Sequence, residues 1–276
     1  MSGFDARIVL RPRSLDETFD LALAYLRVSA RQFLPLFAGL SIVATGIVFV
    51  TSWAFELSLG PRLCLAILLT PVLERVVTVY AGRHLFQSSG LIGPALWAVL
   101  KQLPLIVVIA LFNSLPLLLM AYSRFEEEAF LGFGIMTGMI WPFLVVVHYY
   151  LGEVSHLEQL PLSKAPARAR ALVGYRYGRV FGLLAVGFVV RVLFALGTYS
   201  TGLFVMGFVL QFEEVSSHLG EWAALAGYLA AGPYLALVRL FDYVDARTRR
   251  EGWDIQVRFH AIAQRERARI AERSAA

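Results

Sequence analysis

Three side chains near position 150 have types and a spacing that could hold a metal ion. The segment from His148 to His156 contains the pattern Glu153-x-x-His156, which places a carboxylate and an imidazole on one helix face. His84 and Glu158 could add ligands, but metal sites of this kind need a matching Glu-x-x-His on another helix, and the sequence has none. We therefore expect no bound metal and no cofactor, and we interpret these side chains as interface residues at a helix end.

Charged residues inside apolar segments are the second feature that could do chemistry. By position in their segments, Glu74 lies about 13 Å and Arg191 about 18 Å from the same side of a bilayer. The two side chains could meet as an ion pair that fixes helix packing, or Glu74 could serve an ion or proton pathway. Arg75, about 100° around the helix from Glu74, could extend toward the membrane surface. We favour the ion pair, because a pore usually shows several polar groups per span.

Motifs of soluble catalysis are missing. The sequence has no Gly-x-Ser-x-Gly elbow and no phosphate-binding glycine loop. Cys64 is the single cysteine, so intramolecular disulfides and cysteine-based metal sites are excluded. The sequence therefore predicts a protein that is not an enzyme, and a membrane-embedded hydrolase using His148, Glu153 and His156 is the least favoured function.

The elements that carry these residues are membrane spans. Of 276 residues, 58% are hydrophobic and 16% charged, and the mean hydropathy is +0.65, whereas soluble domains have about 25% charged residues. A span takes about 20 apolar residues. The chain is thus expected to be all-α, an integral membrane helical bundle with interfacial amphipathic helices. Its predicted spans are 33–55, 62–82, 103–123, 130–151, 180–210 and 222–241.

The distribution of Lys and Arg predicts the orientation of these six spans. Most of the 25 basic residues fall in the segments 1–32, 83–101, 152–179 and 244–276. The alternate loops are mainly acidic. Because basic loops stay in the cytoplasm, both termini should lie inside, in a bacterial inner (cytoplasmic) membrane. The chain then divides into a cytoplasmic segment 1–32, a multi-pass membrane domain 33–243 and a basic cytoplasmic tail 244–276.

The fifth span is longer than a bilayer requires. The apolar segment 180–210 contains Gly197-Thr-Tyr-Ser-Thr-Gly202 in its second half. One long tilted helix is an alternative, but we expect a break near Gly197 followed by a short second piece.

Amphipathic helices are predicted on the cytoplasmic side. Residues 14–30 begin with a capping box formed by Ser14 and Glu17. One face of this helix is apolar, and a helix of this kind before a span should lie in the headgroup layer. The apolar face consists of Leu15, Phe19, Ala22, Leu23 and Leu26.

Two basic clusters should contact anionic lipid or partner proteins. The first precedes the fifth span and comprises Lys164, Arg168, Arg176 and Arg179. The second belongs to the tail and includes Arg247, Arg249, Arg250 and Trp253. Since no nucleic-acid-binding motif accompanies the charge, no nucleic-acid partner is expected.

Both ends of the chain resemble one bacterial family. The segment Arg11-Pro-Arg-Ser-Leu-Asp-Glu-Thr-Phe19 and the segment Leu240-Phe-Asp-Tyr-Val-Asp-Ala-Arg-Thr-Arg-Arg-Glu-Gly-Trp-Asp254 are similar to the opening and closing motifs of multi-pass proteins of the glycerophosphodiester phosphodiesterase membrane-domain-like family. A weaker match lies around 153–170. That domain is an accessory module, mostly of unknown function, so the resemblance implies no hydrolase and favours a scaffold or subunit role.

Two functions follow as expectations. The first is a non-enzymatic scaffold or subunit of a membrane or envelope complex, in contact with anionic lipid and with other membrane proteins or further copies of itself. The alternative is a small transporter or channel that uses Glu74 and Arg191. A continuous polar cavity reaching Glu74 would favour transport, and a dry interior with paired charges would favour the scaffold.

Overall fold

The computed structural model of the chain describes residues 11–86, 92–111, 145–158, 160–161, 163–174, 176–211 and 217–252. Within these ranges the regular secondary structure is helical, without a strand. The helices are α1 Leu15–Val28, α2 Ala30–Ala54, α3 Leu59–Phe86, α4 Ile92–Lys101, α7 Leu151–Leu157, α8 Ala165–Val173, α9 Tyr177–Phe204, the π-helical turn η1 Val205–Val209, and α10 Ser217–Glu251.

Four helices in the described part of the chain are long and apolar enough to cross a membrane. They are Ala30–Ala54, Leu59–Leu85, Tyr177–Val209 and Leu219–Glu251. They coincide with the first, second, fifth and sixth predicted spans, so the all-helical architecture with apolar spans is confirmed at this level. Most of the third and fourth predicted spans falls within 112–144, outside the described residues.

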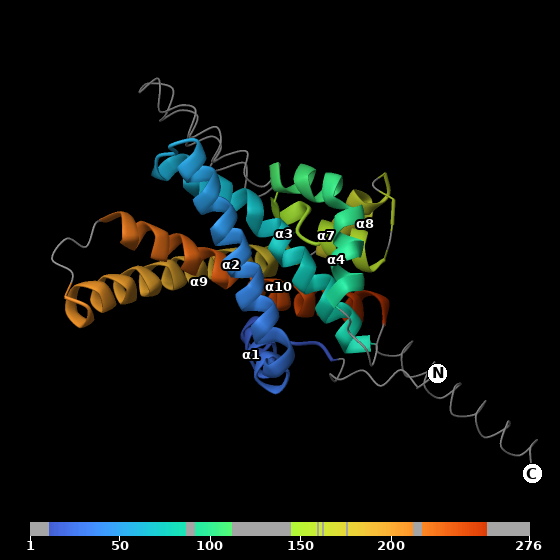
Figure 1. Cartoon of the computed structure of the whole chain (residues 1–276). Coiled ribbons are helices and arrows are strands. Elements are labelled where there is room, and N and C mark those ends of the chain that lie inside the picture. Colours follow the sequence, from blue (N-terminus) through green and yellow to red (C-terminus); the bar gives the residue numbers. More distant parts are fainter. Residues whose placement is uncertain are drawn as a thin grey trace, which may run out of the picture.

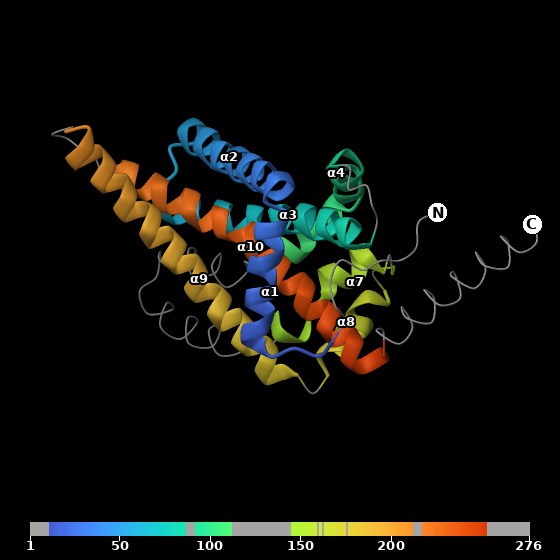
Figure 2. The same ribbon diagram turned by 90° about the horizontal axis from the view of Figure 1, so that it is seen from below.

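Helix α10 is the centre of the fold. It packs against α9, α3, α1, α2 and α8. Figures 1 and 2 show α9 and α10 side by side, with α1 against them and α2 on the same side as α3. The short helices α4, α7 and α8 gather at one side of the bundle (Figure 1). Helices from distant parts of the sequence therefore meet around α10 and α3.

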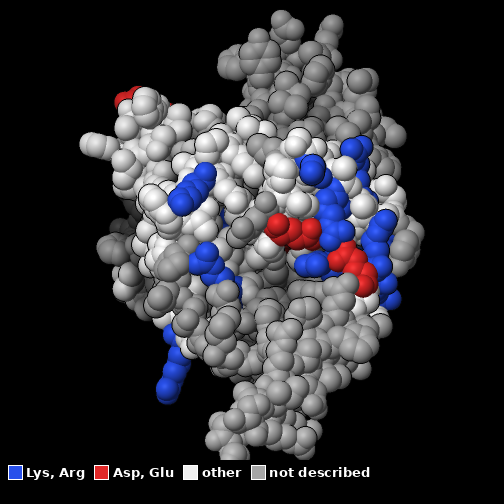
Figure 3. All heavy atoms as spheres, turned by 90° about the vertical axis from the view of Figure 1, so that its right-hand side faces the viewer, with Lys and Arg blue, Asp and Glu red and all other residues white. Residues whose placement is uncertain are grey.

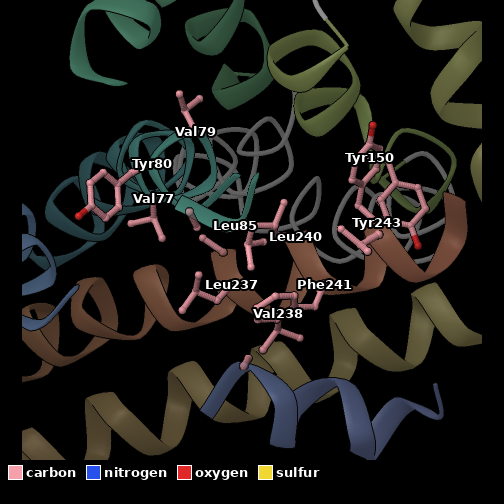
Figure 4. Close-up of a cluster of buried hydrophobic side chains, with 14 of the residues drawn as sticks. Val77, Val79, Tyr80, Leu85, Tyr150, Leu237, Val238, Leu240, Phe241 and Tyr243 are labelled. Atoms are coloured by element: carbon pink, nitrogen blue, oxygen red, sulfur yellow. The ribbon is translucent and has the colours of Figure 1, made fainter. Parts of the chain in front are cut away.

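The core lies between α3 and α10. Figure 4 shows Val77 of α3 on the side facing Leu237 of α10, and both are buried. Tyr80 of α3 is also buried, with its ring centre 5.0 Å from that of Phe33 in α2. Tyr25 of α1 joins this core, where its hydroxyl bonds Nδ1 of His84 and its ring meets that of Phe241 edge-on. Lipid tails are as apolar as these side chains, so burying the side chains away from lipid gives no hydrophobic gain. Inside a bilayer, close packing and interhelical hydrogen bonds therefore hold the helices together.

Helix α1 begins as predicted, and Leu15, Phe19, Ala22 and Leu26 of its predicted apolar face pack in or against the core. The capping box is present, since Oγ of Ser14 accepts from the N–H of Glu17, whose carboxylate accepts from the N–H of Ser14. The buried residues are Thr18, Ala22 and Tyr25, whereas Leu23 of the predicted apolar face is 51% exposed. The hydroxyls of Thr18 and Tyr25 also bond groups of the bundle, which extends the buried side of the helix beyond the predicted apolar residues.

The expected break near Gly197 is wrong. Helix α9 is α-helical through Gly197 as far as Phe204, and the irregular turn is η1 at Val205–Val209. A Cβ at Gly197 would meet no atom within 4 Å, so this glycine marks an open helix surface. Within this continuous helix the hydroxyl of Thr198 donates to the carbonyl of Phe194.

Helix α10 also crosses the predicted boundary at position 243. It runs without interruption from Ser217 to Glu251, so the first residues of the predicted basic tail are part of the long helix. Trp253 and the rest of that tail lie outside the described residues.

Candidate functional site

Five charged side chains, three buried and two partly buried, form an alternating chain across four helices, which we call the charge network. Arg191 of α9 contacts Glu74 of α3. Arg239 of α10 lies 2.8 Å from the second oxygen of Glu74 and 2.6 Å from Oε1 of Glu153 in α7. Arg75 of α3 bonds the same Glu153 oxygen at 2.8 Å. The sequence predicts an ion pair between Glu74 and Arg191, and in the structure these two side chains are in contact.

The helical position of two adjacent residues explains how the network spans the bundle. Glu74 and Arg75 are consecutive on α3, so their side chains point about 100° apart. Glu74 therefore meets α9 and α10, while Arg75 meets α7. Arg75 does not extend to the membrane surface as expected, because its side chain is 4% exposed and bound to Glu153.

Gly152 makes room for Arg75. A Cβ at this position would lie 1.6 Å from Cζ of Arg75 and 1.9 Å from both Nη atoms. The guanidinium of Arg75 thus lies flat against the backbone of α7. Any side chain at position 152 would displace it.

The charge network contains unsatisfied polar atoms. Three arginines face two glutamates, which leaves a net charge of +1. Arg75 Nε, Arg191 Nη1, Arg239 Nη2 and Glu153 Oε2 are buried without a hydrogen-bond partner among the described residues. An unpaired buried polar group costs about 1–3 kcal/mol, and more if charged. The ion pairs of the network connect four helices, but three arginine nitrogens and one glutamate oxygen in it have no hydrogen-bond partner among the described residues.

A cavity of about 460 Å³ lies beside the charge network. Glu74, Arg75, Arg191 and Arg239 line it, together with a larger apolar wall. The guanidinium of Arg191 also lies 5.1 Å from the ring centre of Tyr228, another lining residue. The cavity reaches Glu74, as a transporter would require, while Glu74 itself is paired, as a scaffold would require.

A second cluster of ion pairs, the Asp242 cluster, holds the start of α9 against α10. Arg176 lies 3.1 Å from Asp242 and 2.6 Å from Asp245. Arg179 binds Asp242 at 2.7 Å, and the hydroxyl of Tyr150 donates to the same carboxylate. Both aspartates are fully buried at their side chains, so each needs these cations.

The Asp242 cluster also holds the N-terminal segment. The backbone N–H of Arg13 donates to Asp245 at 2.8 Å, and its carbonyl accepts from Arg179 at 2.9 Å and Arg249 at 2.7 Å. Arg179 further donates to the hydroxyl of Thr18. The two segments that resemble the family's opening and closing motifs therefore contact each other in the fold.

A third cluster lies around Glu158. Arg168 binds Glu158 at 2.8 Å and Glu251 at 2.5 Å, and the hydroxyl of Tyr243 donates to Glu158 at 2.7 Å. Burial favours the neutral acid, but the hydrogen bonds from Arg168 and Tyr243 outweigh it and lower the pKa of Glu158 below its usual value. Figure 3 shows basic side chains gathered around acidic ones on the side of the molecule where α4, α7 and α8 lie.

The candidate metal ligands have other roles in the structure. Glu153 is bound by Arg75 and Arg239, and Nδ1 of His156 lies 2.9 Å from the carbonyl of Gly152. Burial, aided by the charge of Arg75, lowers the pKa of His156 from 6.5 to about 4. His148 lines the cavity instead. Among the described residues, no group of three metal-ligating side chains could hold an ion.

The residues proposed to contact lipid headgroups divide into two groups. Arg176 is 6% exposed and bound to aspartates inside the protein, so it is not a headgroup ligand. Arg168 and Arg179 also have carboxylate partners. Lys164 is exposed, and its lipid contact stays a prediction.

The described part of the tail is likewise engaged in ion pairs. Arg247 lies 3.0 Å from Glu251 and Arg249 lies 3.1 Å from Asp245. Arg250 is exposed, with its guanidinium near Gly174. Gly174 has φ +42°, which a glycine adopts without strain and which separates α8 from α9.

Sequence reasoning missed Arg239 and the partners of Asp242. Arg239 lies near the end of the sixth predicted span, where a basic residue is ordinary. The available signal was its spacing: Arg239 and Asp242 are three positions apart and share a helix face with Leu235. Two opposite charges on one face of an apolar helix indicate that this face meets protein.

Comparisons of the chain with protein-family models, with curated proteins and with solved structures find no match.

Proposed function

We propose that the chain is a non-enzymatic, multi-pass protein of a bacterial inner membrane that acts as a scaffold or subunit of a membrane or envelope complex. The observation that carries this proposal is the commitment of Glu74, Glu153, Asp242 and Asp245 to ion pairs between helices. Carboxylates bound by two or more arginines hold helices in register and are poorly placed for proton transfer.

The proposal includes the predicted topology of six crossings with both ends in the cytoplasm. The distribution of Lys and Arg supports it. Attachment of the segment around Arg13 to Asp245 agrees with it, because this contact requires the N-terminal segment and the end of α10 to lie on one side of the bilayer. The resemblance of both ends to the membrane-domain-like family favours the same accessory role.

Two helices offer surfaces for a partner or for lipid. Within the described structure, α2 and α9 are the least buried of the four long apolar helices. Ile42 and Trp53 of α2 are 70% and 80% exposed, and Phe188 and Leu193 of α9 are 67% and 61% exposed. A scaffold would place its partner against one of these faces, with lipid on the other.

Photo-crosslinking in native membranes tests the proposal. A photoreactive amino acid at Phe188 or Ile42 should give a discrete crosslinked protein band, identified by mass spectrometry as another membrane protein or a second copy. The same group at Leu183, which is 3% exposed on α9, is the matched control and should give no intermolecular product. Lipid adducts alone at every exposed position of both helices would contradict a scaffold role.

A small transporter or channel is the second candidate, favoured by the cavity that reaches Glu74. Transport requires the network around Glu74 to open, since Arg191 and Arg239 both bind this carboxylate. Proteoliposomes loaded with a pH-sensitive dye test it. A proton flux that Glu74→Gln abolishes, while Glu221→Gln leaves it unchanged, would support transport over the scaffold.

A further inference from the structure

The cavity beside the charge network has two chemically different parts. Its volume of about 460 Å³ falls in the range of small-molecule sites, about 300–1,000 Å³. Its charged lining residues are the network side chains Glu74, Arg75, Arg191 and Arg239. Most of the other lining residues are apolar, among them Ile67 of α3, Ile109, and Leu184 of α9. A ligand that fits both parts has a polar head and an aliphatic tail.

The polar end favours a negative head. Arg75, Arg191 and Arg239 all line it, and each keeps one buried N–H donor without a partner among the described residues. The side chain of Arg75 is 4% exposed, so bulk water does not reach it. The network carries a net charge of +1, and one added negative charge would balance it.

We propose that this cavity binds an amphiphilic monoanion. The oxyanion head pairs with the guanidinium groups of the three arginines that line the cavity, and the aliphatic tail contacts the apolar lining residues. A neutral head brings no charge to balance the network, and a cationic head is repelled by it. A carboxylate suits the planar guanidinium groups, which bind two oxygens side by side. This site goes beyond the scaffold role and does not depend on it.

Binding of ten-carbon probes tests the site. The purified full chain in nanodiscs of zwitterionic lipid is titrated with decanoate, decanol or decyltrimethylammonium, and the thermal unfolding midpoint is followed. Decanoate should raise the midpoint, while decanol and the cation should not. Methyl decyl phosphate, a diester with a single negative charge, distinguishes the source of the head: tighter binding than decanoate assigns a lipid phosphate, and weaker binding assigns a fatty-acid carboxylate. Equal shifts with decanol and decanoate would overturn the proposal.

Two variants and a matched control locate the binding. Arg191→Gln should weaken decanoate at least tenfold, because the head loses a cationic donor. Leu184→Trp should weaken it similarly by filling the apolar part without touching the network. Arg62→Gln is the control, since Arg62 is 18% exposed and pairs with Glu221 at 3.3 Å outside the cavity.

The Leu184→Trp variant keeps the proposal testable if Arg191→Gln does not fold. A folded Leu184→Trp or Arg191→Gln protein that binds decanoate as tightly as the wild type would overturn the assignment. Such a failure leaves the scaffold proposal intact, because crosslinking at Phe188 does not involve the cavity.

Discussion

Arg75 and Glu153 are 78 positions apart in the chain, yet Nη1 of the arginine lies 2.8 Å from Oε1 of the glutamate, with both side chains almost completely buried. This contact fixes α7, a helix of only seven residues, against the middle of α3. A helix of two turns is not stable by itself. Its position therefore depends on the buried ion pair and on the glycine that admits the guanidinium.

Gly152→Ala should separate these helices. The added methyl group would overlap Cζ of Arg75, so either the guanidinium leaves Glu153 or α7 shifts. Breaking a buried ion pair costs about 3–5 kcal/mol, and we expect a loss of about that size in unfolding of the purified protein in detergent.

Gly178→Ala is the matched control for Gly152→Ala. A Cβ at Gly178, in the first turn of α9, would meet no atom within 4 Å, and because alanine is favoured over glycine in a helix, stability should not fall. An unchanged stability of Gly152→Ala would contradict the observed position of Arg75.

The charge network shows what sequence reasoning could and could not predict. Depth in the bilayer follows from counting residues, and this was enough to pair Glu74 with Arg191. The partner of a buried side chain depends on how each helix is rotated about its axis and on which helices are neighbours in the bundle. Neither can be read from the local sequence. For this reason Arg239 was overlooked, Arg75 was expected at the surface, and Glu153 was considered a metal ligand.

A similar distinction applies to the helix ends. The capping box of Ser14 and Glu17 is a local pattern, and the structure contains it. The break expected at Gly197 failed because glycine permits a bend without causing one, and α9 continues through it. The role of Arg176 was missed because its partners, Asp242 and Asp245, lie on a different helix.

Gly197→Ala should stabilise the protein. Alanine is favoured over glycine in a helix by about 0.5–1 kcal/mol, and the added Cβ has open space. An increase of this size in the free energy of unfolding would support the continuous helix α9. Destabilisation would indicate that Gly197 needs a conformation closed to alanine.

His156 should make the protein sensitive to mild acid. Its folded pKa is lowered to about 4 from 6.5, so below pH 6.5 the unfolded chain binds a proton that the folded chain does not. The stabilising contribution is therefore complete above pH 6.5 and is lost as the pH falls toward 4. At about 1.4 kcal/mol per pKa unit, the loss should be up to about 3 kcal/mol.

Unfolding measured between pH 7 and 5 checks this pH dependence. Glu158, whose pKa is lowered from 4.5, contributes only at lower pH. Within that window His156→Gln should flatten the curve, while His148→Gln serves as the control. An equally steep curve in the His156→Gln variant would refute the assignment to this side chain.

Asp245→Asn should release the N-terminal segment. The carboxylate accepts the N–H of Arg13 and binds Arg176 and Arg249, and an amide holds two cations poorly. We expect faster hydrogen–deuterium exchange at the amide of Arg13. Glu251→Gln, at the same end of α10 but bound to Arg168, should leave that amide unchanged. Protection of Arg13 equal to wild type in Asp245→Asn would argue against this attachment.

The claim that buried ion pairs hold the helices together is tested most directly by a double-mutant cycle on Glu74 and Arg191. Glu74→Gln leaves both Arg191 and Arg239 without this carboxylate, and it should destabilise the protein by about 3–5 kcal/mol. Adding Arg191→Gln should restore part of the loss, with a coupling energy of about 1–3 kcal/mol. The Arg62–Glu221 pair, whose side chains are 18% and 26% exposed and 3.3 Å apart, should couple more weakly than Glu74 and Arg191 do. Strictly additive losses at Glu74 and Arg191 would contradict the account.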